Sequence, residues 1–283
     1  MDLAAPAAYD VSAALDVLRT HRFVALTGAG VSTDSGIPDY RGPGSPSRTP
    51  MTYQQFVAGA EARRRYWARS HLGWTRMRRA VPNPGHTALA RLERLGRLRM
   101  VITQNVDGLH ELAGSDNVCA LHGRITEVVC LSCRQRTSRQ VLHRRLGDLN
   151  PGWQERHAHA AVRPDGDVDL DDTSGFHVPD CTTCGGVLKP DVVFFGEAVP
   201  KPRVQRCYAE VEASEALLVA GSSLTVMSGR RFVRHAARLG KPVVIVNRGT
   251  TRGDELAAYK LDLGTSEFLT VLAEALETSG TLR

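Results

Sequence analysis

Short apolar runs recur along the chain, and each stops at glycine or at polar residues. Five of them lie at 22–27, 99–103, 192–195, 216–220 and 242–246. Runs of this length without alternating polar positions are typical of parallel strands buried on both faces. Helical stretches separate several of them, at 12–20, 86–95, 202–214 and 229–239. This alternation predicts an α/β fold, with a doubly wound, mostly parallel sheet that is Rossmann-like.

Two cysteine pairs interrupt this pattern between the second and third runs. They are Cys130-x-x-Cys133 and Cys181-x-x-Cys184, the ligand spacing of a tetrahedral zinc site of four thiolates. We therefore expect a zinc-binding module with a long insert at 122–187, within a discontinuous domain made of 1–121 and 188–283. The insert either lies loosely on the surface or packs partly through Trp153, and its acidic stretch at 164–172 is loop-like.

The composition is that of a globular protein. The chain has 283 residues, of which 42% are hydrophobic and 23% charged. No apolar run approaches the roughly 20 residues of a membrane span, and Met1–Thr20 does not resemble a secretory signal. Cys119 and Cys207, outside the pairs, are expected to be buried thiols in a reducing compartment. We expect a cytoplasmic protein, with bacterial cytosol favoured over an organelle matrix.

The net charge of +6 arises from arginines that cluster at 63–65, 76–79 and 91–99. One interpretation is solvated helix faces; the other is weak attraction to acidic proteins or nucleic acid. Aromatic residues do not interleave with these arginines as in proteins that stack bases. We therefore expect no specific nucleic-acid partner and no membrane partner, whereas the oligomeric state stays open.

The first run leads into a glycine-rich segment that begins Gly28-Ala29-Gly30 and continues to Arg41. Glycines after a strand let the backbone approach phosphates, and a following helix start offers amide donors. The spacing is neither G-x-G-x-x-G nor a P-loop. The extension Gly36-Ile37-Pro38-Asp39-Tyr40-Arg41 is more specific, because it adds charge beside the phosphate site.

Polar residues also follow the other strands, where open α/β sheets bind ligands. Asn105 and Asp107 follow the second strand, and they either point into a crevice or form the turn and cap of the next helix. His122 stands between this crevice and the first cysteine pair, where a neutral imidazole is suited to take a proton from a sugar hydroxyl. Small or polar residues that end later strands are Gly196, Glu197, Gly221, Ser222, Ser223, Asn247, Arg248 and Gly249.

Together these segments resemble the sirtuin family of NAD-dependent protein-lysine deacylases. The matching motifs occur in family order, at 28–41, 103–110, 122–123, both cysteine pairs, 189–197, 221–224 and 246–249. Finer features resemble the class II (sirtuin-4-like) branch. They are Tyr40, Arg65-Tyr-Trp-Ala-Arg69, Pro82-Asn-Pro-Gly-His86, the insert that begins Leu149-Asn-Pro-Gly-Trp153, and Pro164-Asp-Gly-Asp167.

The resemblance implies a reaction and a set of roles. The acyl oxygen of an acyl-lysine attacks C1′ of the nicotinamide ribose of NAD, nicotinamide leaves, and His122 then acts as general base on the ribose hydroxyls. Free lysine and O-acyl-ADP-ribose result. The peptide lies as an added strand between the segments after Phe195 and after Ser223. Asn105, Asp107 and Ile37 shape the nicotinamide pocket. Residues implied to contact NAD also include Gly28, Ala29, Gly30, Ser32, Asp39, Tyr40, Arg41, Gln104, Val106, Gly221, Ser222, Ser223, Asn247, Arg248, Gly249 and Thr265.

The zinc would be structural, since four thiolates leave no open position. Implied substrate contacts are Tyr66, Arg69, Val192, Phe195, Gly196 and Glu197. Tyr66-x-x-Arg69 has the spacing of a pair that reads acidic acyl chains in the desuccinylase branch. Alternatively, Arg69 lies on a solvated helix face and Tyr66 packs in the core.

Three other functions compete with deacylation. Mono-ADP-ribosyl transfer to protein would use the same cleft. A second alternative is a non-catalytic NAD-binding module. It would not explain why the chain keeps Asn105, Asp107 and His122 in a polar cleft, since each costs free energy to hold there. A zinc-ribbon nucleic-acid binder would leave the NAD motifs unexplained, and steeply salt-dependent DNA binding would be its signature.

Overall fold

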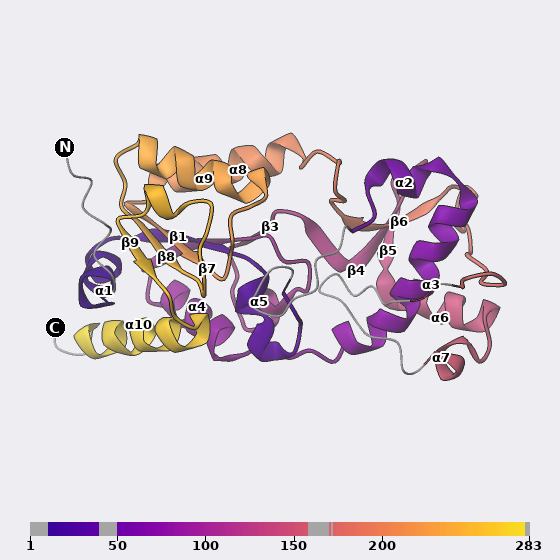
Figure 1. The fold of residues 1–283 in the computed structure, drawn as a ribbon, viewed down its shortest axis with the longest axis horizontal. Coiled ribbons are helices and arrows are strands. Elements are labelled where there is room, and N and C mark those ends of the chain that lie inside the picture. The colour runs from indigo at the N-terminus through magenta and orange to yellow at the C-terminus, as the bar shows by residue number, and fades with distance from the viewer. Residues whose placement is uncertain (1–10, 40–49, 158–169, 171, 281–283) are drawn as a thin grey trace.

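A six-stranded sheet forms the centre of the larger lobe (Figure 1). The computed structural model describes residues 11–39, 50–157, 170 and 172–280. The strand order is β3–β2–β1–β7–β8–β9, and all neighbours pair in parallel. The strands are β1 (Phe23–Thr27), β2 (Leu98–Thr103), β3 (Val118–Ala120), β7 (Ala216–Ala220), β8 (Val243–Val246) and β9 (Tyr259–Leu261). The predicted α/β fold with a doubly wound parallel sheet is therefore confirmed.

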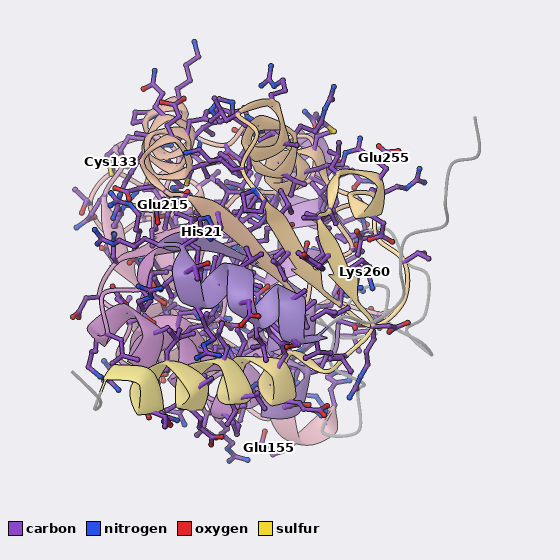
Figure 2. The ribbon with its side chains drawn as sticks, turned by 90° about the vertical axis from the view of Figure 1, so that its left-hand side faces the viewer. His21, Cys133, Glu155, Glu215, Glu255 and Lys260 are labelled. Atoms are coloured by element: carbon purple, nitrogen blue, oxygen red, sulfur yellow. The ribbon has the colours of Figure 1, made fainter. Side chains whose placement is uncertain are left out.

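Helices cover both faces of this sheet, which explains why its central strands are continuous apolar runs. The face toward α10 is covered by α1 (Val11–Thr20), α4 (Pro84–Arg94) and α10 (Thr265–Gly280), and the opposite face by α8 (Lys201–Ala213) and α9 (Met227–Arg238). Figure 2 shows the strands lying above the yellow α10. Each face has its own core, and β1 is buried along its whole length between them.

A three-stranded antiparallel sheet forms the centre of the smaller lobe. Its order is β5–β4–β6, with β4 (Gly123–Cys130), β5 (Arg136–Ser138) and β6 (Leu188–Val192). The helices of this lobe are α2 (Tyr53–Ala58), α3 (Ala60–Met77), α6 (Arg139–Leu149) and α7 (Trp153–Arg156). Trp153 is only 6% exposed and packs into the core of this lobe with Trp67. The alternative in which the insert packs through Trp153 is thus confirmed, while most of the predicted 164–172 loop lies outside the described residues.

One strand prediction is wrong. The run at 192–195 does not join the main sheet, because β6 ends at Val192 and pairs with β4. Phe194 instead packs edge-on against Phe56, and Phe195 forms an isolated bridge with Thr52. The apolar residues of the run therefore make this aromatic contact and line the cavity, and they are not buried within the main sheet. The predicted domain limits stay predictions. The three-stranded sheet includes β6, which begins at Leu188, one residue after the predicted end of the zinc-binding module.

The short elements that follow β1 and β2 line the edge of the main sheet near the smaller lobe. They are η1 (Ala29–Val31), η2 (Thr33–Ser35) and α5 (Leu109–Leu112), while η3 (Asp254–Leu256) precedes β9. An apolar cluster that includes Ile37, Trp74 and Ile125 joins the two lobes. Within the described part of the chain, no helix combines the length and apolar character needed to cross a bilayer.

Candidate active site

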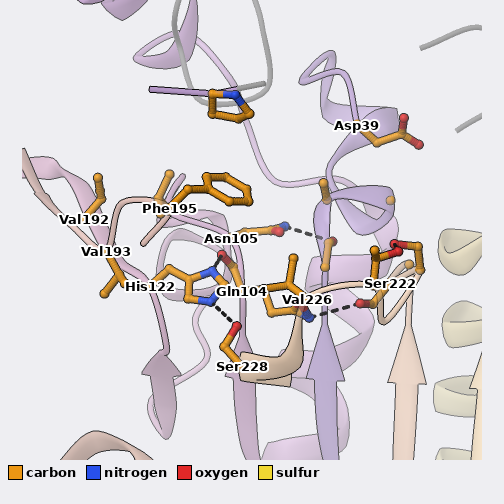
Figure 3. Close-up of a pocket in the computed structure, with 18 of the residues that line it drawn as sticks. Asp39, Gln104, Asn105, His122, Val192, Val193, Phe195, Ser222, Val226 and Ser228 are labelled. Atoms are coloured by element: carbon orange, nitrogen blue, oxygen red, sulfur yellow. Dashed lines mark hydrogen bonds between the residues drawn. The ribbon is translucent and has the colours of Figure 1, made fainter. Parts of the chain in front are cut away.

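A cavity of about 780 Å³ lies where the carboxyl ends of the main strands face the smaller lobe (Figure 3). Ligands of open α/β sheets bind at this edge. The cavity brings together most of the predicted site residues from seven separate stretches of the chain. Those that line it are Gly28, Ala29, Gly30, Ser32, Ile37, Asp39, Tyr66, Gln104, Asn105, Val106, Asp107, His122, Val192, Phe195, Gly196, Glu197, Gly221, Ser222, Ser223, Asn247, Arg248 and Gly249.

Four predicted residues stand apart from this set. Tyr40 and Arg41 lie outside the described residues. Thr265 is buried at the start of α10, where its hydroxyl lies 3.4 Å from the carbonyl oxygen of Gly30. Thr265 thus contacts the glycine segment but does not line the cavity. Arg69 does not line the cavity either, whereas Tyr66 does.

Two glycine segments form one wall of the cavity by packing backbone against backbone. The amide of Gly30 donates to the carbonyl oxygen of Gly221 at 2.9 Å, and the amide of Gly28 donates to Ala220 at 3.1 Å. Gly221 has φ of 62°, in the left-handed region that favours glycine. The hydroxyl of Ser222 and the amide of Asn247 lie beside this wall. Glycine backbone and small polar groups suit the phosphate and ribose parts of a dinucleotide, so these residues fit NAD.

Ser32, Asn105 and Asp107 form a hydrogen-bond network on the cavity wall. The side-chain amide of Asn105 donates to the carbonyl oxygen of Gly28 and to the hydroxyl of Ser32, both at 3.0 Å. Ser32 donates to the Asp107 carboxylate at 2.8 Å. Asp107 also accepts from the amide of Leu109 at 2.9 Å, so it supports the next helix as well as facing the cavity. Burial raises the pKa of Asp107, although both hydrogen bonds oppose this shift.

His122 lies at the seam between β3 and β4, with both ring nitrogens engaged. Its Nδ1 is 2.9 Å from the carbonyl oxygen of Gln104 and its Nε2 is 2.8 Å from the hydroxyl of Ser228 (Figure 3). A carbonyl oxygen only accepts, so Nδ1 carries the proton of the neutral ring and Nε2 carries the free lone pair. Burial lowers the pKa of His122 to about 4. The ring is therefore neutral at pH 7, with its basic nitrogen on the cavity side.

The segment at 192–197 forms the wall contributed by the smaller lobe. Its backbone is held by Tyr53, whose amide donates to the carbonyl oxygen of Phe195 at 2.9 Å. The Glu197 carboxylate accepts from the amide of Phe194 at 3.0 Å and pairs with the buried Lys189 at 3.0 Å. Phe195 itself is 41% exposed and lines the cavity. The segment thus presents an open apolar side chain on a well-anchored backbone.

The four paired cysteines converge at the edge of the smaller lobe. Their sulfurs all lie within 4.8 Å of one another, with Cys130 and Cys184 at 3.5 Å and Cys133 and Cys181 at 3.8 Å. Four sulfurs bound tetrahedrally at about 2.3 Å from a zinc ion would lie about 3.8 Å apart. The geometry therefore fits a structural Zn²⁺ held by all four thiolates, none of which lines the His122 cavity.

Several cavity residues were not predicted from the sequence. They are Pro50, Met51, Ile125, Val193, Phe194, Ala198, Val199, Thr225, Val226, Met227, Ser228, Arg231 and Thr250. Ser228 is the most consequential, because it contacts the basic nitrogen of His122. The one sequence signal was its place four residues after Leu224, where a serine looks like an ordinary helix-start residue.

A model of the Sir2 family matches residues 28–228, which include most of the cavity and all four paired cysteines. The chain belongs to the Sir2 family. This Sir2 protein is 56% identical over 275 residues to NAD-dependent protein deacetylase 1 of Streptomyces coelicolor, a match that covers 96% of this chain and 91% of the relative. It is 55% identical over 263 residues to NAD-dependent protein deacetylase 1 of Mycobacterium avium, covering 92% and 93%.

Solved structures agree with this assignment. A structure described as Sir2 with a p53 peptide and NAD⁺ has a TM-score of 0.74 and 31% identity, covering 97% of this chain and 100% of that chain. One described as the structural basis for sirtuin substrate affinity has a TM-score of 0.75 and 29% identity, covering 97% and 100%. The family resemblance found in the sequence is thus confirmed.

Proposed function

We propose that this Sir2 protein is an NAD-dependent protein-lysine deacylase. The observation that carries the proposal is that His122 lines the same cavity as two different groups of residues. On one side lie the glycine segments and polar residues that fit NAD, and on the other lies the anchored segment at 192–197. Relatives over 50% identical bear the name NAD-dependent protein deacetylase, and a structural neighbour holds a peptide with NAD⁺.

NAD supplies the ribose carbon that takes the acyl oxygen, with nicotinamide as leaving group. The residues of this chain bind, orient and move a proton. The Ser32–Asn105–Asp107 network keeps polar atoms at the carboxyl ends of β1 and β2, where the nicotinamide half would lie. Ser222, Ser223 and Asn247 would hold the adenosine half. Neutral His122 takes the proton of a ribose hydroxyl at Nε2, because Nδ1 is held by Gln104.

The acyl-lysine peptide would lie along 192–197. Extended peptides bind as added strands through main-chain hydrogen bonds, and the exposed Phe195 supplies apolar contact beside them. Tyr66 reaches the same cavity through an aromatic cluster with Phe56 and Phe194. Zn²⁺ would stabilise the smaller lobe through the four cysteines without entering the reaction.

Finer assignments rest on the sequence motifs. We infer the class II branch from Tyr40, from the segment Arg65-Tyr-Trp-Ala-Arg69 and from the insert that begins at Leu149. The relatives named above are bacterial deacetylases and do not test this branch. We also infer a cytoplasmic protein that binds no specific nucleic acid. Mono-ADP-ribosyl transfer is less well supported, because the substrate wall at 192–197 is suited to a peptide strand and the named relatives are deacetylases.

The test measures nicotinamide release from NAD with acetyl-lysine peptides, for the wild type and for His122→Ala. Mass spectrometry of the products follows the acyl group. We expect release that requires the acylated peptide, formation of O-acyl-ADP-ribose, and loss of that product in the variant. His235→Ala, a partly buried histidine of α9 that does not line the cavity, is the control and should keep full activity. No release with any acyl peptide, or ADP-ribose attached to protein, would refute the proposal.

A further inference from the structure

The Ser228 hydroxyl is hydrogen-bonded to the basic nitrogen of His122. Since Nδ1 of the neutral ring donates to Gln104, Nε2 is an acceptor, and the Ser228 hydroxyl 2.8 Å away must donate to it. Among the described residues, this is the one hydrogen bond of the Ser228 hydroxyl. A serine oxygen that donates its single proton keeps two acceptor lone pairs, and Ser228 lines the cavity.

We propose that Ser228 relays the substrate proton to His122, an inference that rests on the proposed deacylase function. A ribose hydroxyl that donates to the Ser228 oxygen would complete a chain from sugar to hydroxyl to Nε2. The sugar O–H bond breaks as its proton moves to the serine oxygen, and the serine proton moves to Nε2. Ser228 ends neutral, and one proton has passed from the sugar to His122. Hydrogen-bonded chains of this kind polarise each member.

The start of α9 is built to hold Ser228 at this position. Ser228 is the second residue of the helix, where the unpaired amides and the helix dipole favour negative charge. That field stabilises the negative charge that develops on the serine oxygen as its proton moves to Nε2 of His122.

Gly229 permits the close approach of this helix to Gln104. A Cβ at Gly229 would lie 2.6 Å from the side-chain nitrogen of Gln104, which itself donates to Ser222 at 3.0 Å. Gln104 therefore holds Nδ1 of His122 through its backbone, while its side chain packs against the turn that delivers Ser228 to Nε2. The two partners of the histidine ring are coupled through one residue.

The test separates the two halves of the reaction in Ser228→Ala and Ser228→Thr. Exchange of labelled nicotinamide into NAD reports the step before the base acts, and O-acyl-ADP-ribose formation reports the whole reaction. We expect S228A to lower product formation about ten- to hundredfold while exchange stays within about twofold of wild type. S228T keeps a hydroxyl and should recover most of the product formation. Ser214→Ala removes a buried hydroxyl outside the cavity and serves as the matched control.

Solvent isotope effects give a second measurement that does not depend on the threonine variant. Product formation in mixtures of H₂O and D₂O should show more than one moving proton in the wild type and a single one in S228A. The relay is overturned if S228A makes product at the wild-type rate, if its exchange and product formation fall together, or if S228T is as slow as S228A. A wild type with neither exchange nor product would refute the deacylase proposal instead.

Discussion

A Cβ added to Gly28 would lie 2.7 Å from the carbonyl oxygen of Gly221, closer than real side chains approach. Its neighbours are backbone atoms and the Cβ of Ser222, and none of them is the end of a flexible side chain. The segment after β1 and the segment after β7 can therefore touch only if residue 28 is glycine. This contact places the two glycine segments side by side on the cavity wall.

We accordingly predict that Gly28→Ala destabilises the protein by about 1–3 kcal/mol and raises KM for NAD more than it lowers kcat. Gly147→Ala is the matched control, because the nearest atom to its Cβ is 4.0 Å away and it lies inside α6. That control should stabilise the helix by about 0.5–1 kcal/mol. Urea unfolding measures the change in stability, and steady-state kinetics at varied NAD concentration measures KM and kcat. A Gly28→Ala protein with wild-type KM for NAD would contradict this account.

The cysteine cluster predicts one zinc ion per chain and a smaller lobe that needs it. Chelation or Cys184→Ser should release the metal and unfold that lobe, because binding free energy is folding free energy at such sites. All three tryptophans, at 67, 74 and 153, lie in this lobe or at its junction, so intrinsic fluorescence reports it directly. Metal analysis should show zinc lost in Cys184→Ser and retained in Cys207→Ala, which lies outside the cluster. A zinc-free protein with unchanged fluorescence would rule out the structural role.

Buried neutral histidines predict a loss of stability in mild acid. Burial lowers the pKa of His110 and His122 to about 4 and that of His86 to about 3, each below the ordinary value of 6.5. The unfolded chain thus binds more protons than the folded one between these values. The stabilisation is complete above pH 6.5 and falls as the pH drops from 6.5 toward 4, by on the order of 3 kcal/mol for a fully shifted histidine.

Urea midpoints at several pH values check this expectation. His110→Gln tests a single group, because His110 is fully buried and its Nε2 lies 2.9 Å from the hydroxyl of Thr27. Glutamine keeps a polar partner for Thr27 and does not titrate, so the variant should lose stability less steeply below pH 6.5 than the wild type. Equal slopes in the two proteins would show that His110 is not a source of the effect.

The position of Arg69 predicts the acyl preference. Arg69 does not line the cavity, and Tyr66 reaches it as part of an aromatic cluster. Arg69→Met should therefore leave the ratio of kcat/KM for acetyl- and succinyl-lysine peptides unchanged, with the acetyl peptide preferred. A selective loss of activity on succinyl-, glutaryl- or methylglutaryl-lysine would restore the hypothesis that Arg69 binds acidic acyl chains.

The local pattern of residues was sufficient to predict the central strands of the main sheet. It was insufficient to predict the strands at the two edges of that sheet. The runs that became β1, β2, β7 and β8 were predictable because they are buried on both faces and carry no polar interruption. The three-residue strands β3 and β9 were missed, since so few residues carry no periodicity. The run at 192–195 was misplaced because Phe194 packs on Phe56 and Phe195 lines the cavity, tertiary contacts that no local pattern reveals.

The amino-acid sequence by itself determined the parallel α/β sheet, the two cysteine pairs, the family and most residues that line the cavity. The sheet and the cysteine pairs follow from the spacing of residues that are close together in the chain, whereas the family and most site residues follow from the resemblance of the motifs. Only the tertiary structure decided that Arg69 stays away from the cavity while Tyr66 reaches it, and that Ser228 meets His122. Ser228 and His122 stand on different elements and meet through the packing of α9 on Gln104, a long-range contact that spacing along the chain does not encode.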